Sequence, residues 1–282
     1  APNLSRACRY QWLIHSRRGS VRDLFRISTL YHLSLMVLPS KLGELSYPYF
    51  LNRISGMPMT EGLASLIASR IYDFFTILIL FAVASLGFQN LMRLSPYWIV
   101  FLSAFSIALV LLSFCYMGLL LNLFSRLVGR ASMLLGRGAV ERVRWVQLKI
   151  HTMAEDFYAI QAKRSFLPVT LTTLASWILS YWMFYAFVRS FGISVTFMEV
   201  VFGSTIAIVA NILPVSGIGN WGILEAGWAV GFLLVGLSKV DAIATGFGVH
   251  ILLFITSGIT SFFSWLTLKK HQSPSHSASS GK

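Results

Sequence analysis

Charged side chains stand inside segments that are otherwise apolar, and their types are the ones in this sequence that could do chemistry. Arg70 and Asp73 lie three residues apart in one such segment, His250 falls in the middle of another, and Glu44 and Glu225 each follow a glycine-containing turn. Ionisable groups at membrane depth are costly, so they usually face an interior site or one another. They would suit the binding of a charged headgroup, and a buried glutamate could also carry a proton.

Each of these residues also has a structural interpretation. Arg70 and Asp73 could neutralise each other on one helix face. The two glutamates could cap the half-helices that follow them, and His250 could be a hydrogen-bonded packing residue. Lys41 could meet a lipid phosphate as a point charge or extend to the membrane interface. The sequence leaves both interpretations open.

The turn before Glu225 interrupts a segment that is too long for one span. Residues 200–238 carry a single charge, and a straight helix of this length would run about 58 Å, roughly twice the hydrocarbon thickness of a bilayer. Its middle, "LPVSGIGNWG", contains a proline and three glycines, which predicts two short helices with an irregular turn. Backbone donors freed in this turn, together with Asn211, Ser216 and Asn220, would suit an anionic headgroup.

A second interrupted segment contains Glu44. Residues 27–49 are apolar but broken at "LPSKLGE", so two short helices are expected here as well. Irregular backbone at membrane depth is tolerated only where it is packed inside protein or lines a wet cavity. Both interrupted segments are therefore predicted to be re-entrant hairpins that meet in the protein interior.

The composition is that of an integral membrane protein. The chain has 282 residues, of which 56% are hydrophobic and only 12% charged, and its mean hydropathy is +0.70; a soluble domain has about 25% charged residues. The net charge of +13 comes from basic residues that flank apolar runs, which argues against nucleic-acid binding. Cys8 and Cys115 fall in different environments, and histidines are few, so neither a disulfide framework nor a metal site is indicated.

The predicted fold is an all-α, polytopic membrane domain with about four full spans and the two re-entrant hairpins. The segments long enough to span are residues 63–87, 97–122, 166–188 and 242–268. Lys and Arg number sixteen in the segments 6–26, 124–164 and 269–270, but three in the opposite loops. This bias places both ends of the chain on the cytoplasmic side of the cytoplasmic membrane, with the first hairpin entering from that side and the second from the far side.

The chain divides into one membrane domain, residues 1–268, and a polar tail, residues 269–282, that is predicted to be disordered. Within the domain, residues 124–164 form a basic linker in which apolar residues recur at gaps of three and four between 143 and 160. This pattern predicts an amphipathic helix on the membrane surface or, alternatively, one packed on another helix. The start of the chain lacks the apolar region of a signal peptide, so further residues, with room for one more span, are expected before it.

The two interrupted segments are followed by similar sequences. Glu61 stands nine residues before Arg70, and Asp241 stands nine residues before His250. Both acids are expected to begin spanning helices, and Ser238 with Asp241 fits a capping pattern. Because the predicted topology gives the two halves opposite orientations, the sequence indicates an inverted repeat, in which the broken helices face each other and form a substrate site near the midplane.

At these same residues the sequence resembles a known family, the transmembrane flippase-like region of lysylphosphatidylglycerol synthetases and the stand-alone membrane proteins related to it. The resemblance covers roughly residues 28–268. A Pro-Gly-Arg-Leu-Gly-Glu-like motif stands here as "PSKLGE" (39–44), a Glu-Arg pair followed by Asp as "SRIYD" (69–73), and a Leu-Pro, Gly-rich, Gly-x-x-Glu motif as "LPVSGIGNWGILE" (213–225). This sequence departs from the family at Ser69, where Glu is usual, and at His250, where Arg is common.

The resemblance implies movement of lipids with charged or glycosylated headgroups across the membrane. A soluble aminoacyl-transferring domain follows the membrane region of full synthetases; here a polar tail follows, so a stand-alone member is expected. The expected partners are membrane lipids and, in addition, a second copy of the chain or a lipid-synthesising enzyme. No cofactor, no catalytic residue and no nucleotide-binding motif is indicated, so any drive must come from a gradient, a partner or the lipid's own imbalance.

The sequence therefore predicts a lipid flippase that is not an enzyme. One alternative is an ion-coupled transporter of a small solute, which uses the same inverted plan. Others are a membrane enzyme acting on lipid headgroups, for which no nucleophile–base pair stands out, and a non-transporting partner of a lipid synthase. The predicted substrate-binding residues are Lys41, Glu44, Arg70, Asp73, Asn211, Ser216, Asn220, Glu225 and His250.

Overall fold

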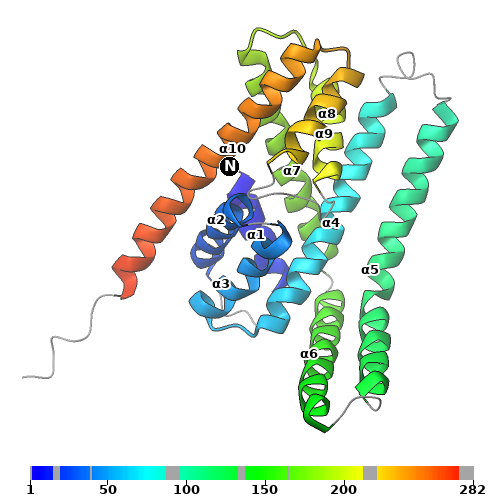
Figure 1. The fold of residues 1–282 in the computed structure, drawn as a ribbon, viewed down its shortest axis with the longest axis vertical. Helices are drawn as coiled ribbons and strands as arrows, with labels where there is room; N and C mark the ends of the chain where they lie inside the picture. Colours follow the sequence, from blue (N-terminus) through cyan, green and yellow to red (C-terminus); the bar gives the residue numbers. More distant parts are fainter. Residues whose placement is uncertain are drawn as a thin grey trace, which may run out of the picture.

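The protein is built of helices arranged as a bundle (Figure 1). The computed structural model describes residues 2–14, 20–38, 40–86, 96–132, 137–163, 165–211 and 221–272, and this part of the chain contains no strand. The helices are α1 (Pro2–Leu13), α2 (Val21–Val37), the 3-10 helix η1 (Ser40–Leu45), α3 (Ser46–Ser55), α4 (Met59–Leu86), α5 (Pro96–Ser132), α6 (Arg137–Ala162), α7 (Phe166–Ser190), α8 (Phe197–Ala210), α9 (Ile223–Leu234) and α10 (Lys239–Gln272).

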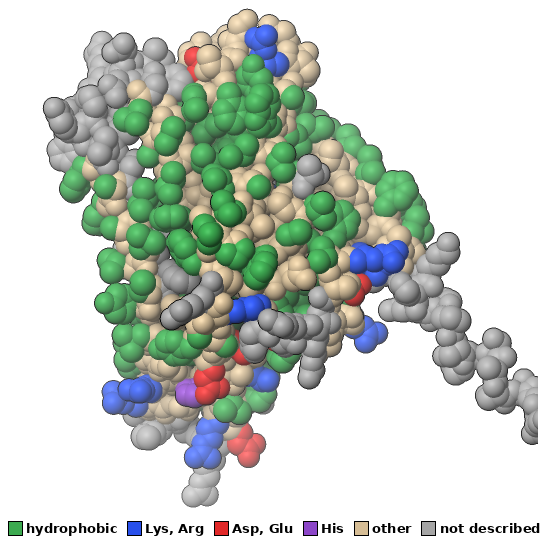
Figure 2. All heavy atoms as spheres, turned by 180° about the vertical axis from the view of Figure 1, so that it is seen from behind, with side chains coloured by type: hydrophobic (Ala, Val, Ile, Leu, Met, Phe, Trp, Pro, Cys, Tyr) green, Lys and Arg blue, Asp and Glu red, His purple; other side chains and the backbone are tan. Residues whose placement is uncertain are grey.

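Long apolar helices confirm that this is a polytopic helical membrane protein. Among the described residues, α4, α7 and the stretch Lys239–Thr267 of α10 are long and apolar enough to cross a membrane, and they correspond to three of the four predicted spans to within one residue at their C-terminal ends. The fourth predicted span, residues 97–122, lies within α5, whose 37 residues extend about 55 Å. Hydrophobic side chains cover the middle of the face shown in Figure 2, and most basic ones lie below them.

The first interrupted segment forms two helices joined by a tight connection, as predicted. α2 ends at Leu38, which has extended backbone, and η1 then leads into α3. Gly43 allows this connection to pack closely on α2, because a Cβ at this position would lie 2.8 Å from Cα of Leu35 and 2.9 Å from the carbonyl oxygen of Ser34. The glycine therefore brings the next residue, Glu44, against α2.

The second interrupted segment also forms two helices, α8 and α9, which pack closely together. Small residues make the contact possible: a Cβ on Gly227 would lie 2.8 Å from Cα of Ala207, and one on Gly231 would collide with the carbonyl oxygen of Gly203. Close approach of backbones at small residues is a common way of packing helices in membranes, where lipid offers no hydrophobic drive for association. Most of the turn between α8 and α9 lies outside the described residues.

Gly231→Ala is expected to destabilise the α8–α9 hairpin by about 1–3 kcal/mol, because the new methyl group forces the two backbones apart. Gly258→Ala on α10 is the matched control, since a Cβ there meets nothing within 4 Å. Thermal denaturation of the detergent-solubilised variants measures the effect. Equal stability of the two variants would contradict the packing role of Gly231.

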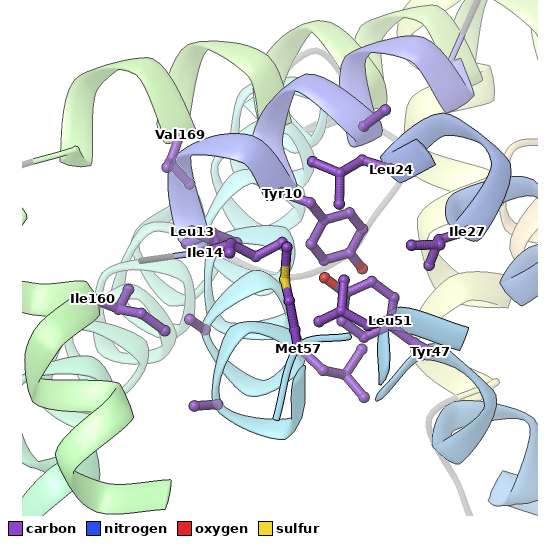
Figure 3. Packing of buried hydrophobic residues seen from close by; sticks show 14 of the residues in the cluster. Tyr10, Leu13, Ile14, Leu24, Ile27, Tyr47, Leu51, Met57, Ile160 and Val169 are labelled. Carbon is purple, nitrogen blue, oxygen red and sulfur yellow. The ribbon is translucent and has the colours of Figure 1, made fainter. Parts of the chain in front are cut away.

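A hydrophobic core joins the N-terminal helices to α6 and α7 (Figure 3). Tyr10 of α1 stacks on Tyr47 of α3 with ring centroids 4.3 Å apart. Tyr47 also meets Tyr31 of α2 edge-on at 5.6 Å. Ile160 of α6 and Val169 of α7 are buried in the same cluster. The core therefore fixes α1 inside the bundle, and with it the polar side chains that α1 presents to α4.

The topology count assumed that all basic residues of the segment 6–26 are charges of a loop, and this assumption is wrong for two of them. Among its described residues, Arg9 of α1 and Arg26 of α2 are buried. Arg26 donates a hydrogen bond to Asp23 at 2.9 Å and another to the side chain of Thr267 on α10 at 3.1 Å. Both arginines are paired with a carboxylate of the protein, so they are not free charges of a loop.

The periodic apolar stripe of residues 143–160 lies on α6, which packs against α5 and α4 (Figure 1). Ala154 and Phe157 are buried, and Ser125 of α5 donates to the carbonyl of Gln147 at 3.1 Å. The structure thus shows the alternative of a helix packed on other helices. The reason is that α5 continues to Ser132, well past the predicted span, and offers a helical neighbour.

α4 and α10 run in opposite directions, upward and downward in the view of Figure 1. α2 packs along the second half of α10, where Thr29 donates to Ser264 at 2.8 Å. α10 ends at Gln272, so residues 269–272 of the predicted tail are helical, which suits two lysines at a helix C-terminus. The rest of the tail, residues 273–282, lies outside the described residues.

Candidate functional site

Arg70 joins the spanning helix α4 to the first hairpin. Its Nη2 donates to Oε1 of Glu44 at 2.6 Å and to the hydroxyl of Tyr31 at 2.5 Å. Tyr31 in turn donates to Oε2 of Glu44 at 2.5 Å. One guanidinium, one carboxylate and one phenol thus form a closed triangle between α2, η1 and α4. Glu44 is an ion-pair partner here, which goes beyond the capping role considered from the sequence.

Asp73 is held by residues from two other helices. Arg9 of α1 donates to Oδ1 of Asp73 at 2.5 Å, and the indole N–H of Trp177 on α7 donates to the same oxygen at 2.9 Å. Arg70 lies 3.7 Å from the other oxygen. The contact between Arg70 and Asp73, which the sequence offered as the structural alternative, is therefore the longer ion pair of both residues, because each has a closer partner on another element.

Further polar residues extend this first cluster. Arg6, one turn before Arg9 on α1, contacts Nε2 of His32 through its Nη1 at 2.9 Å. The three arginines of α1 and α4 face two carboxylates, those of Glu44 and Asp73, so the cluster has a surplus of positive charge. A surplus of guanidinium groups is suited to an anion, because the flat fork of an arginine matches the oxygens of a phosphate or a carboxylate.

The first cluster is closed on one side and open on the other. The side chains of Arg9 and Asp73 are 3% and 10% exposed, whereas those of Arg70 and Glu44 are 36% and 26% exposed. Arg70 and Glu44 are therefore within reach of a ligand, while Arg9 and Asp73 fix the position of α4 behind them. Nε of Arg9 is buried and has no hydrogen-bond partner among the described residues.

A second cluster joins the other hairpin to α10. Nδ1 of His250 lies 2.6 Å from Oε1 of Glu225, and both side chains are buried. The backbone N–H of Gly222 donates to the second carboxylate oxygen at 2.8 Å, so Glu225 also caps the start of α9. The ring of Trp221 stacks on that of His250 with centroids 4.2 Å apart. The indole ring of Trp221 thus covers one face of the imidazole.

Hydrogen bonds between buried side chains fix this second hairpin to its neighbours. Trp228 of α9 donates to the hydroxyl of Thr245 on α10 at 3.1 Å, and the hydroxyls of Tyr181 on α7 and Thr205 on α8 lie 2.7 Å apart. At the start of α10, the backbone N–H of Asp241 donates to Ser238 at 3.1 Å, as the capping pattern predicted. Each hairpin is thus attached to a spanning helix through a glutamate and a basic residue, Glu44 with Arg70 and Glu225 with His250.

The structure groups the predicted site residues into these two clusters and leaves others unassigned. Glu44, Arg70 and Asp73 belong to the first, and Glu225 and His250 to the second. Asn211 lies at the end of α8, next to the turn. Ser216 and Asn220 lie outside the described residues, and so does the side chain of Lys41. No group of three His, Cys, Asp or Glu residues in the described ranges is placed to hold a metal ion.

The sequence prediction missed the residues that complete the first cluster, namely Arg6, Arg9, Tyr31, His32 and Trp177. The spacing of Arg6 and Arg9, three apart on one helix face, was a usable signal. The topology count treats both arginines as charges of a loop. No pattern in the sequence pointed to Tyr31 or Trp177, because aromatic residues are abundant throughout the chain.

Comparison with known proteins gives one finding. No curated protein and no solved structure matches the chain. Residues 2–260, which include α1 and both clusters, match a family described as the lysylphosphatidylglycerol synthase TM region. The match covers most of the chain, so the protein belongs to the lysylphosphatidylglycerol synthase transmembrane-region family.

Proposed function

We propose that the protein moves a phospholipid or a lipid-linked headgroup across the membrane. The headgroup would pass along the open side of the first cluster while the acyl chains stay in the bilayer. The family's description names a phospholipid synthase, which supports a lipid as the substrate. The proposal is one of transport without chemical change, and it assigns no catalytic role to any residue.

The observation that carries the proposal is the partly exposed Arg70–Glu44 pair, whose arginine lies on the long apolar helix α4. The Arg9–Asp73 pair behind it is closed off, with side chains only 3% and 10% exposed, so it offers a ligand no access. Arg70 instead keeps about a third of its side chain accessible. A phosphate that reached it would find a guanidinium already oriented by Tyr31 and Glu44, so little ordering would be needed on binding.

The similar attachment of the two hairpins supports an inverted repeat. Glu44 pairs with Arg70 and Glu225 pairs with His250, and each basic residue stands at the twelfth position of its helix, α4 or α10. These two helices run in opposite directions (Figure 1). An inverted repeat offers two related states open to opposite sides of the membrane, which is what translocation of a headgroup requires.

The distribution of basic residues supports an orientation with the chain ends in the cytoplasm. Exposed arginines such as Arg126 and Arg130 lie at the far end of α5, whereas Arg189 and Lys239 lie at the opposite end of the bundle. With Arg9 and Arg26 removed from the count, the excess of basic residues on the first side remains. In this orientation the first hairpin enters from the cytoplasmic side.

The test is a translocation assay in proteoliposomes that contain one labelled lipid at a time. The expected result is faster translocation of an anionic phospholipid than of a zwitterionic one, because the first cluster has more arginines than carboxylates. A labelled diacylglycerol, which lacks the phosphate, is the matched control and should not be accelerated. A chemical quencher added outside the vesicles measures the label that has changed leaflet.

Other outcomes of the same assay would favour the rival functions. Acceleration of no lipid at all would contradict the proposal and favour a non-transporting partner of a lipid synthase. Uptake of a small anionic solute into the vesicles without lipid movement would favour an ion-coupled transporter. Equal acceleration of the anionic lipid and the diacylglycerol would show that the arginines do not select the substrate.

A further inference from the structure

The Glu225–His250 pair leaves one buried nitrogen without a partner. Nδ1 of His250 is engaged by Glu225 at 2.6 Å, and the His250 side chain is fully buried. Nε2 of the same ring has no hydrogen-bond partner among the described residues. An unsatisfied nitrogen in a buried position reduces stability, and such groups are often kept for a function.

The two clusters differ in whether they can exchange a proton. Arg70 keeps its charge at every pH that a cell reaches, so the charge of its pair with Glu44 is fixed. An imidazole gains and loses a proton at about pH 5–8. The second cluster occupies the corresponding position between a hairpin and a spanning helix, but its basic residue is an imidazole, whose Nε2 has a lone pair that can accept a proton.

We propose that Glu225 and His250 form a proton-binding site, and that binding and release of its proton move the second hairpin. The ligand is a single proton, and Nε2 of His250 is the atom that binds it. The coupling of this proton to lipid movement rests on the proposed function. The existence of the site does not.

The proton balance is simple. A proton already lies between Nδ1 and the carboxylate, as a hydrogen bond of 2.6 Å requires, so the pair carries one negative charge when Nε2 is bare. A proton from water that binds the lone pair of Nε2 gives an imidazolium beside a carboxylate, which is neutral overall. Its release to water restores the negative charge, and no other bond forms or breaks.

The neutral state fits the packed arrangement. A neutral pair costs less to bury than a single negative charge, and the Trp221 ring stacked on His250 favours an imidazolium through its π face. Loss of the proton leaves an unbalanced carboxylate that gains from hydration. Glu225 also holds the N–H of Gly222 at the start of α9, so hydration of this carboxylate would loosen the hairpin at its turn.

The charged groups on neighbouring helices do not compete for this pair. Glu225 is the only ionisable residue of α9. On α2, Asp23 and Arg26 bond to each other beside Thr267 at the far end of α10, while Tyr31 and His32 belong to the first cluster.

On α7, Tyr181 bonds to Thr205 of α8, Tyr185 packs on the rings of Trp182 and Phe197, and Arg189 is exposed at the end of the helix. The direct contacts of the His250 ring described by the structure are thus Glu225 and Trp221.

The test of the site is nitrogen NMR of the full chain, labelled with ¹⁵N-histidine and placed in lipid nanodiscs. The signals of His250 are identified by their loss in His250→Gln. We expect them to report the reversible gain and loss of one proton as the pH is changed, and Glu225→Gln to weaken proton binding at least tenfold because the carboxylate charge is gone. His151→Gln is the matched control, since His151 faces Glu155 at 3.5 Å on the exposed surface of α6.

Hydrogen exchange of residues 223–234 follows the hairpin in the same samples. These amides should exchange faster when His250 has lost its proton, and His250→Gln should remove this dependence on pH after correction for the intrinsic exchange rate. The proposal would be overturned by a folded protein in which His250 keeps one protonation state at every pH measured. If His250→Gln does not fold, the displaced signals in Glu225→Gln identify His250 instead.

Coupling to transport is tested in proteoliposomes with an imposed pH gradient. The gradient should change the rate of lipid translocation at least fivefold in the wild type and leave the rate in His250→Gln unchanged. Titration of His250 without lipid movement would refute the proposed function but keep the proton site. Lipid movement that ignores the gradient in the wild type would refute the coupling.

Discussion

Asp73→Asn is expected to lower the free energy of unfolding by about 3–5 kcal/mol, because it leaves a buried arginine without its counter-charge. Arg9 is 2% exposed and depends on Asp73, which it approaches to 2.5 Å. Nε of Arg9 already has no hydrogen-bond partner among the described residues, so no other acceptor there is placed to replace Asp73. A buried guanidinium without a counter-charge inside a membrane protein is costly, which is the reason for the large expected loss.

Thermal denaturation and size-exclusion chromatography in detergent measure this effect. Glu155→Gln is the matched control, since it neutralises a carboxylate of an exposed pair that lies 3.5 Å from His151 and contributes at most about 1 kcal/mol. Equal thermal stability of the two variants would show that the Arg9–Asp73 contact does not hold α1 against α4.

The double substitution Arg9→Met with Asp73→Asn separates charge from packing. Removing both charges takes away the unpaired guanidinium, so the double variant should recover most of the stability that Asp73→Asn loses. A double variant as unstable as the sum of the two single ones would mean that the charges act independently. The indole of Trp177 can still donate to the amide oxygen of residue 73, which limits the remaining loss.

Arg70→Gln is expected to slow lipid translocation at least tenfold, since it removes the exposed guanidinium proposed to receive the phosphate. Nη2 of Arg70 donates to both Glu44 and Tyr31, and the shorter side chain of a glutamine cannot replace these contacts. Tenfold corresponds to about 1.4 kcal/mol, which is less than a charge-assisted hydrogen bond contributes. Arg189→Gln, at an exposed position at the end of α7, is the control and should leave the rate unchanged.

The double variant Arg70→Gln with Glu44→Gln distinguishes binding from structure. If Arg70 serves only to neutralise Glu44, removing both charges should restore translocation along with stability. If it receives the headgroup, the double variant should fold and still fail to move lipid. The proteoliposome assay with the anionic phospholipid gives the rate, and thermal denaturation of the same preparations gives the stability.

The two interrupted helices could be predicted because they depend on short-range patterns. Charge at 61 and 241, the glycine turns before Glu44 and Glu225, and the basic residues Arg70 and His250 are all features of local sequence. Helix length and hairpin breaks follow from glycine, proline and apolar periodicity, which act within a few turns of chain. The α8–α9 break was expected for this reason.

The environment of α1 could not be predicted in the same way. Its mixture of arginines, a cysteine and aromatic residues resembles a cytoplasmic segment as much as a buried helix. Only packing against α7, α2 and α4 turns Arg9 into a buried partner of Asp73. The same holds for α6, whose apolar stripe is compatible with a lipid surface or a protein surface until its neighbours are known.

By itself, the sequence determined a polytopic helical membrane protein with two interrupted helices and charged residues inside apolar segments, because hydrophobic length, breaks and charge are properties of local composition. Only the tertiary structure decided which charges meet. Arg70 pairs with Glu44 more closely than with Asp73, Asp73 pairs with Arg9, and Glu225 pairs with His250. The partners stand on different helices, and their distances depend on how those helices pack, which no spacing along the chain encodes.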